Sequence, residues 1–152
     1  MAGDLVADTD TAGHDGNALM LVYLDSVICV YAVEGAPSFQ ARARTRLADL
    51  KPAGDQPAIS DLTWLECRVK PIRLGDAAAL ADMEAFLNAS DVVRVSMPTT
   101  VFERACRIRA LHGYKLADAL HLASAVESGC GLFLTNDHRL SNFPDITVEV
   151  LP

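Results

Sequence analysis

The stretch of sequence that decides the fold reads MLVYLDSVICV and spans residues 20–30. Residues 21–24 are a short apolar run of the length that a buried strand takes. Asp25 and Ser26 follow directly, and either side chain is a good N-cap for a helix. Residues 28–33 continue with mostly apolar side chains, as a packed helix requires. The stretch therefore predicts a buried strand that leads through a polar cap into a helix.

The same alternation of strand and helix continues along the chain. Pro and Gly make residues 51–57 a loop, and Pro71 is expected to interrupt or kink the helix that contains it. Strands alternating with helices predict an α/β fold with a mainly parallel central sheet. We expect further strands at residues 58–60, 92–95, 132–134 and 147–151, and helices at residues 38–50, 61–70, 77–88, 99–111 and 116–128.

Length and composition indicate one globular domain. The chain has 152 residues, of which 51% are hydrophobic, and no apolar run approaches the about 18 residues of a membrane span. Residues 1–18 are rich in Gly, Asp, Thr and Ala, so we expect a disordered tail before a folded domain at residues 20–152. The four cysteines form no C-x-x-C pair and are expected to be buried free thiols in a reducing cytoplasm.

The net charge of −7 neither supports nor excludes a partner rich in phosphate groups. Residues 1–18 carry four Asp and no Lys or Arg, and the remaining chain holds 16 acidic and 13 basic residues. If four of those acids bind a metal, the rest of the domain is slightly positive. Charge alone therefore leaves nucleic acid open as a substrate.

Four acidic residues fall where the ends of the expected strands meet. Asp25 follows the first strand, and Glu66 lies early in the helix after the second. Asp118 lies in the first turn of the helix before the fourth strand, and Asp137 follows that strand. Ligands of open parallel sheets bind at the carboxyl ends of the strands. We therefore expect these four carboxylates to converge at one edge of the sheet.

Carboxylates at close range repel one another strongly, so either some of the four are protonated or cations neutralise them. Oxygen ligands suit Mg²⁺ or Mn²⁺. In phosphodiester hydrolysis, metal ions of this kind activate a water, hold the scissile phosphate and stabilise the leaving oxygen. Hydrolysis of phosphodiesters is thus a standard chemical use of such a cluster.

The segments that carry these acids resemble a known family. The four segments are Val22-Tyr-Leu-Asp-Ser26, Ile59-Ser-Asp-Leu-Thr-Trp-Leu-Glu66, Leu116-Ala-Asp-Ala-Leu-His-Leu-Ala123 and Leu134-Thr-Asn-Asp-His-Arg-Leu140. Their order and spacing are similar to those of PIN domains, and in particular of VapC toxins, the ribonucleases of VapBC toxin–antitoxin pairs. The resemblance covers about residues 20–151.

The resemblance implies a three-layer α/β/α sandwich, a Mg²⁺ or Mn²⁺ site, an RNA substrate, a homodimer and a cognate antitoxin as protein partner. It implies that the four acids are the metal ligands and catalytic residues. It places Ser26, Thr135 and Asn136 on the polar positions beside them. His121 is a further candidate to support a ligand or contact the substrate, from its position in the helix of Asp118 alone. Two departures are the Ser-Val that follows Asp25 and the acidic N-terminus, and neither affects an acidic position.

Each candidate residue also has a plainer interpretation. Asp25 is a possible helix cap, Glu66 a solvated helix residue, Asp118 a residue that only interacts with the helix dipole, and Asp137 an ordinary turn residue. His121 lies one helical turn after Asp118, and a structural histidine is the more common case. Only the combination of the four acids favours a metal site.

The sequence therefore predicts a metal-dependent endoribonuclease, the toxin of a type II toxin–antitoxin system. One alternative is a catalytically inactive PIN-like module that only binds its antitoxin or RNA. A second is phosphoryl transfer with Asp25 as the nucleophile, although the Asp-x-Asp of dehalogenase-like phosphatases is absent. DNA also stays open as a substrate, because no motif in the sequence reads a 2′-hydroxyl.

Overall fold

The computed structural model describes residues 19–152 and has a single parallel sheet at its centre. The five strands lie in the order β3-β2-β1-β4-β5, and each neighbouring pair is parallel. The expected tail at residues 1–18 lies outside the described residues. No helix in the described part is long and apolar enough to cross a membrane.

The elements follow one another as expected from the sequence. The strands are β1 (Leu21–Leu24), β2 (Gln56–Ser60), β3 (Val93–Val95), β4 (Leu132–Thr135) and β5 (Thr147–Val150). The helices are α1 (Ser26–Glu34), α2 (Pro37–Ala48), α3 (Asp61–Arg73), α4 (Ala77–Leu87), α5 (Thr99–His112) and α6 (Leu116–Glu127), with a short 3₁₀ helix at His138–Leu140.

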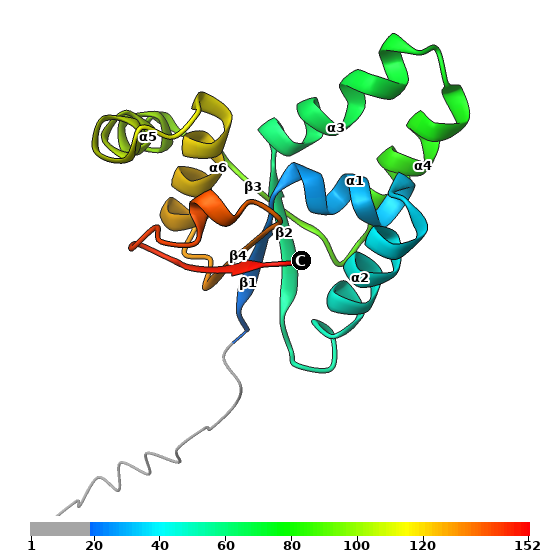
Figure 1. The fold of residues 1–152 in the computed structure, drawn as a ribbon, viewed down its shortest axis with the longest axis horizontal. Coiled ribbons are helices and arrows are strands. Elements are labelled where there is room, and N and C mark those ends of the chain that lie inside the picture. The colour runs from blue at the N-terminus through cyan, green and yellow to red at the C-terminus, as the bar shows by residue number, and fades with distance from the viewer. Residues whose placement is uncertain (1–18) are drawn as a thin grey trace, which may run out of the picture.

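Helices cover both faces of the sheet (Figure 1). Helices α1 to α4 pack on the face to which Val22 and Leu24 of β1 point. Helices α5 and α6 pack on the other face, to which Tyr23 and Phe133 point. Because successive strand residues face opposite sides, one short strand contributes to both cores. The fold is thus the predicted three-layer α/β/α sandwich.

The order in which strands are added to the sheet reverses at β1, although all strands run parallel. The segments after β1 build β2 and β3 on one side of it, and β4 and β5 lie on the other. The amide of Asp25 donates to the carbonyl of Leu134 (2.9 Å), so the ends of β1 and β4 are tied together. In doubly wound sheets this point of reversal is where a crevice for a ligand forms.

Several local predictions were wrong. Strand β2 begins at residue 56, not 58. Pro57 lacks an amide hydrogen, but it fits in the strand because it has a neighbour on the β1 side only, and pairing with β3 starts at Ala58. Helix α3 continues through Pro71 to Arg73, since the proline lies in its last turn. Cys106 is exposed on α5, whereas the other three cysteines are buried free thiols as expected.

Candidate active site

Asp25 is held at the end of β1 by both of its carboxylate oxygens. It is the N-cap of α1, where its Oδ1 accepts a hydrogen bond from the amide of Ser26 (2.8 Å). Its Oδ2 accepts one from the hydroxyl of Thr135, at the end of β4 (2.7 Å). That hydroxyl oxygen in turn accepts from the amide of Asp137 (3.1 Å). The two strand ends therefore fix the orientation of this buried carboxylate.

Glu66 reaches the same edge from the second turn of α3. Its Oε1 accepts hydrogen bonds from the hydroxyl of Ser26 (2.8 Å) and from Nε2 of His121 on α6. Burial opposes the charge on Glu66, but these two hydrogen bonds outweigh it and hold the pKa of the carboxyl below its usual value. Among the described residues Oε2 has no hydrogen-bond partner, so it is available to a ligand.

Asp118 is the least well satisfied of the four acids. It lies in the first turn of α6, and its side chain is only 19% exposed. It accepts no hydrogen bond from the described part of the chain, and its nearest cation is Arg139, with 3.8 Å between Nη2 and Oδ2. Burial raises the pKa of Asp118, and the negative charges of Asp25 and Asp137 raise it further.

Asp137 is paired with Arg139, two residues further along. The two side chains form a bidentate pair, with 2.6 Å between Nη2 and Oδ2, and the amide of Arg139 also donates to Oδ1 (2.9 Å). Asp137 is the N-cap of the 3₁₀ helix that begins with His138. The guanidinium of Arg139 holds the pKa of the Asp137 carboxyl below its usual value.

The structure therefore brings the four predicted acids to one edge of the sheet. Ser26 joins Asp25 to Glu66, Thr135 joins Asp25 to Asp137, and His121 contacts Glu66. Asn136 differs, because its side chain donates to the hydroxyl of Tyr31 (2.8 Å) and not to a carboxylate.

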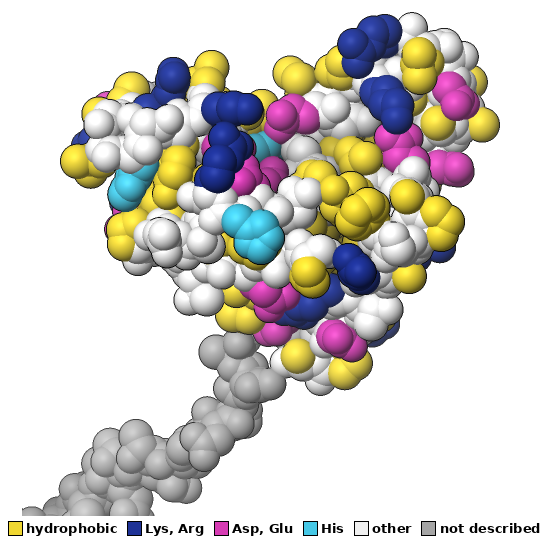
Figure 2. Space-filling model, viewed as in Figure 1, with side chains coloured by type: hydrophobic (Ala, Val, Ile, Leu, Met, Phe, Trp, Pro, Cys, Tyr) yellow, Lys and Arg dark blue, Asp and Glu magenta, His cyan; other side chains and the backbone are white. Residues whose placement is uncertain are grey.

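The same edge is a hollow in the surface. Figure 2 shows acidic and histidine side chains in the notch between the α5–α6 part of the molecule and the α3–α4 part. Basic side chains lie along the α5–α6 side of the notch.

The donor chemistry of the site fits a hard divalent cation. The candidate ligands are carboxylate oxygens, and the mutual repulsion at Asp118 is what such a cation relieves. Within residues 19–152, no three His, Cys, Asp or Glu side chains are yet close enough together to hold a metal ion. Binding one requires the carboxylates to close in and Arg139 to give up its contact with Asp118.

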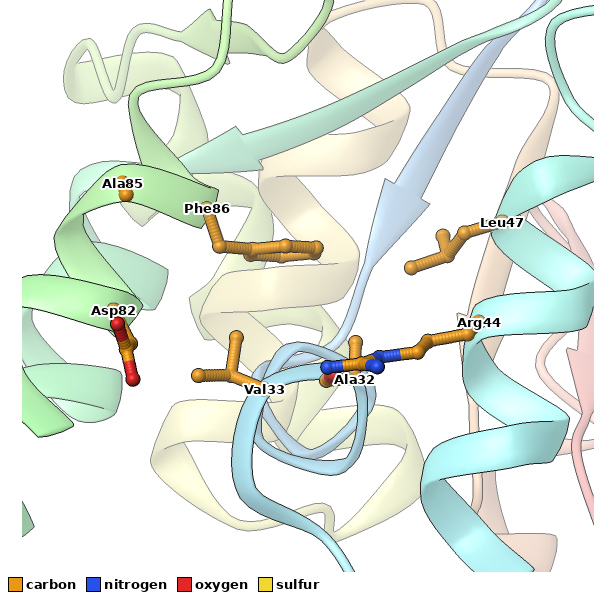
Figure 3. Close-up of a pocket in the computed structure, with 7 residues that line it drawn as sticks. All are labelled: Ala32, Val33, Arg44, Leu47, Asp82, Ala85 and Phe86. Carbon is orange, nitrogen blue, oxygen red and sulfur yellow. Dashed lines mark hydrogen bonds between the residues drawn. The ribbon is translucent and has the colours of Figure 1, made fainter.

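A separate pocket lies among α1, α2 and α4 (Figure 3). Phe86 and Leu47 point towards each other across it, and Arg44 lies along its wall, donating from Nε to the carbonyl of Ala32 (2.8 Å). Asp82 is the one acidic residue in its lining. One carboxylate and a guanidinium already bound to the backbone offer no set of groups for hydrolysis, so the candidate chemistry stays at the sheet edge.

Comparison with known proteins agrees with this geometry. The family model described as PIN domain matches residues 22–146, which is most of the folded part. The chain belongs to the PIN domain family. The matched region includes all four acids, and the predicted family is confirmed. No curated protein sequence matches this PIN domain.

Solved structures share the fold of this PIN domain. One is VapBC2 from Rickettsia felis bound to a promoter DNA fragment (TM-score 0.67, 17% identity, covering 86% of this chain and 98% of that one). Another is a toxin–antitoxin complex from Klebsiella pneumoniae (0.64, 21%, 83% and 95%). A third is VapC20 from Mycobacterium tuberculosis, a sarcin–ricin loop cleaving toxin (0.62, 15%, 74% and 86%).

Two residues of the site were not found from the sequence. Tyr23 donates to or accepts from three side chains behind Glu66, but in the sequence it is one more apolar strand residue. Arg139 lies in one of the four segments that carry the acids, but the sequence gives no role for its pairing with Asp137. A charged residue two positions after an N-cap aspartate is the signal that indicates such a local ion pair.

Proposed function

We propose that the chain is a Mg²⁺- or Mn²⁺-dependent endoribonuclease and the toxin of a type II toxin–antitoxin pair. The observation that carries the proposal is the convergence of Asp25, Glu66, Asp118 and Asp137 at the edge of the sheet in a PIN domain. Four separate segments contribute one carboxylate each. A role as a helix cap or turn residue explains single acids, but it does not require the four to meet at one place.

The residues of the chain have distinct parts in this proposal. Asp25 and Glu66 are oriented by hydrogen bonds and present fixed oxygens to the cation. Asp118 accepts no hydrogen bond from the described residues, so of the four acids it gains most from the positive charge of the cation. Asp137 exchanges its contact with Arg139 for the cation, which leaves the guanidinium free to face a phosphate. The bound ion supplies an activated water and neutralises charge on the phosphate.

The proposed partners are RNA and a cognate antitoxin. The Rickettsia, Klebsiella and Mycobacterium structures are described as toxin–antitoxin complexes or as a toxin that cleaves the sarcin–ricin loop, which supports both partners. The homodimer stays a prediction, supported by Leu65, Val69 and Ile72, which form an exposed apolar stripe on α3. The proposed place of action is the cytoplasm, where RNA and antitoxin meet.

Cleavage of a mixed RNA substrate by the purified chain, with and without Mn²⁺, tests the activity. We expect cleavage only with the ion, and we expect Asp118→Asn to lose more than the about 10- to 100-fold typical of residues that merely support ligands. Asp82→Asn, in the distant pocket, is the matched control and should cleave like the wild type.

The same assay separates the alternatives. No cleavage of RNA by a protein that still binds Mn²⁺ would favour the inactive binding module. Cleavage of single-stranded DNA at an equal rate would contradict the ribonuclease assignment. Full activity of Asp118→Asn would contradict the carboxylate site itself.

A further inference from the structure

Behind Glu66 lies a chain of buried polar side chains that no step above uses. Nδ1 of His121 is 2.7 Å from the hydroxyl of Tyr23, and that hydroxyl is 2.7 Å from Oγ of Ser60. All three residues are at most 1% exposed. His121 comes from α6, Tyr23 from β1 and Ser60 from the end of β2. Tyr23 is 98 residues from His121 and 37 residues from Ser60 in sequence, so only the tertiary fold assembles them.

The direction of these hydrogen bonds follows from the partner at the far end. Oε1 of Glu66 is a carboxylate oxygen and only accepts, so Nε2 of His121 carries a hydrogen towards it. In the neutral ring Nδ1 is then an acceptor, and the Tyr23 hydroxyl donates to it. The Tyr23 oxygen in turn accepts from the hydroxyl of Ser60.

Ser60 suits the beginning of such a chain. It is the N-cap of α3 and forms a capping box with Thr63, whose Oγ1 accepts from the amide of Ser60 (3.3 Å). Its Oγ is thereby held against the helix start while its hydroxyl hydrogen remains for Tyr23. The same helix carries Glu66, so both ends of the chain are fixed to α3.

The aromatic ring of Tyr23 is itself held in place. It stacks on Phe133 of β4, with ring centroids 5.4 Å apart and planes 7° apart, and it meets His121 edge-on. Loss of its hydroxyl would therefore leave the ring where it is. What would be lost is the donor that selects one tautomer of His121.

We propose that Tyr23 and His121 are positioning residues for Glu66, with Ser60 as the start of a relay in which Tyr23 fixes His121 as the Nε2–H tautomer. The proposal rests on the proposed metal-dependent function, because Glu66 is there a ligand whose free oxygen must point at the ion. Groups that orient ligands from behind change metal affinity or activity by about 10- to 100-fold when removed.

The tautomer is measured on the intact chain by ¹⁵N NMR of histidine-labelled protein. The chain has four histidines, and the His121 signals are those absent in His121→Gln. We expect the wild type to show a neutral ring with the hydrogen on Nε2, and Tyr23→Phe to show a mixture. A hydrogen on Nδ1, alone or together with Nε2, in the wild type would overturn the relay, and this readout does not depend on any activity.

Mn²⁺ binding, followed by electron paramagnetic resonance, tests what the relay does. We expect Tyr23→Phe to bind Mn²⁺ about tenfold more weakly. The matched control is Ser124→Ala, which removes an equally buried hydroxyl from α6 that bonds only to the carbonyl of Leu120. It should bind like the wild type, and equal weakening of both variants would overturn the proposal.

A second pair of variants serves if Tyr23→Phe does not fold. His121→Gln keeps an N–H donor at the position of Nε2, whereas His121→Asn is too short to reach Glu66. We expect His121→Gln to retain Mn²⁺ binding at least tenfold better than His121→Asn, and equal binding would overturn the proposal. Wild-type protein that binds no Mn²⁺ would instead overturn the proposed function, whatever the tautomer.

Discussion

The two halves of the carboxylate site are built in different ways. The inner half consists of Glu66, His121 and Tyr23, where His121 is 1% exposed and each buried polar side-chain atom has a hydrogen-bond partner. The outer half consists of Asp118, Asp137 and Arg139, where the Arg139 side chain is 62% exposed and pairs with both acids. The inner half is therefore set by folding, whereas the outer half can rearrange when a ligand arrives.

The largest effect on stability is expected in the inner half. His121→Ala leaves a cavity and removes partners from Tyr23 and Glu66, so the free energy of unfolding should fall by about 2–4 kcal/mol. Urea denaturation measures this loss. The control is His138→Ala at an exposed position of the short 3₁₀ helix, which should change the free energy of unfolding by less than about 0.5 kcal/mol. Equal values for the two variants would contradict the difference between the halves.

An opposite and smaller effect is expected in the outer half. Burial and neighbouring charges raise the pKa of Asp118, so its folded form binds a proton more tightly than the unfolded chain does. Its contribution to stability is therefore present at low pH and is lost as pH rises from the unfolded value of 3.8 through the folded pKa.

Asp118→Asn removes the cost of burying a negative charge beside two other carboxylates. The variant should therefore unfold at a higher temperature than the wild type at pH 7, although we expect it to lose cleavage. The gain should vanish below the ordinary pKa of an aspartate. Thermal unfolding at several pH values measures it, with Asp145→Asn on an exposed loop as the control. A lower melting temperature for Asp118→Asn at pH 7 would show that Asp118 is a stabilising residue.

The smallest effect on the fold is expected for Arg139→Ala. Arg139 depresses the pKa of Asp137, so in the variant that pKa should rise towards its ordinary value, as ¹³C NMR titration would measure. Because the pKa of Asp137 is lowered, its ion pair stabilises the fold above the unfolded pKa, and this contribution is lost as pH falls through the folded pKa. The variant should therefore be slightly less stable than the wild type at neutral pH, and the difference should disappear in acid. Mn²⁺ binding should not weaken, and weaker binding would contradict competition between Arg139 and the ion.

The sequence predicts the features that local patterns determine, and it misses those that depend on how elements pack or pair. The apolar runs at residues 21–24 and 132–134 predict strands because local pattern decides burial there. The start of β2 at residue 56 was missed, because a rule that places proline in loops ignores a position paired on one side only. The four acids were predicted because each lies just after a strand or in the first two turns of a helix, which is a local property.

The relay and the ion pair were missed for a different reason. The hydroxyl of Tyr23 finds Ser60 and His121 only after three elements pack, and a strand residue with an aromatic ring gives no sign of it. Arg139 pairs with Asp137 through a short 3₁₀ helix that the sequence presents as loop. The contacts of Tyr23 depend on packing between elements, about which local patterns carry no information, whereas the Asp137–Arg139 pair is local and was missed because the turn that forms it was not expected.

The position of β4 has a consequence during synthesis of the protein. Strand β1 is made first but pairs with β4, which ends at Thr135, and Asp137 follows still later in a chain of 152 residues. A nascent polypeptide therefore has no complete set of the four carboxylates until Asp137 has been made, however early β1 and α1 form.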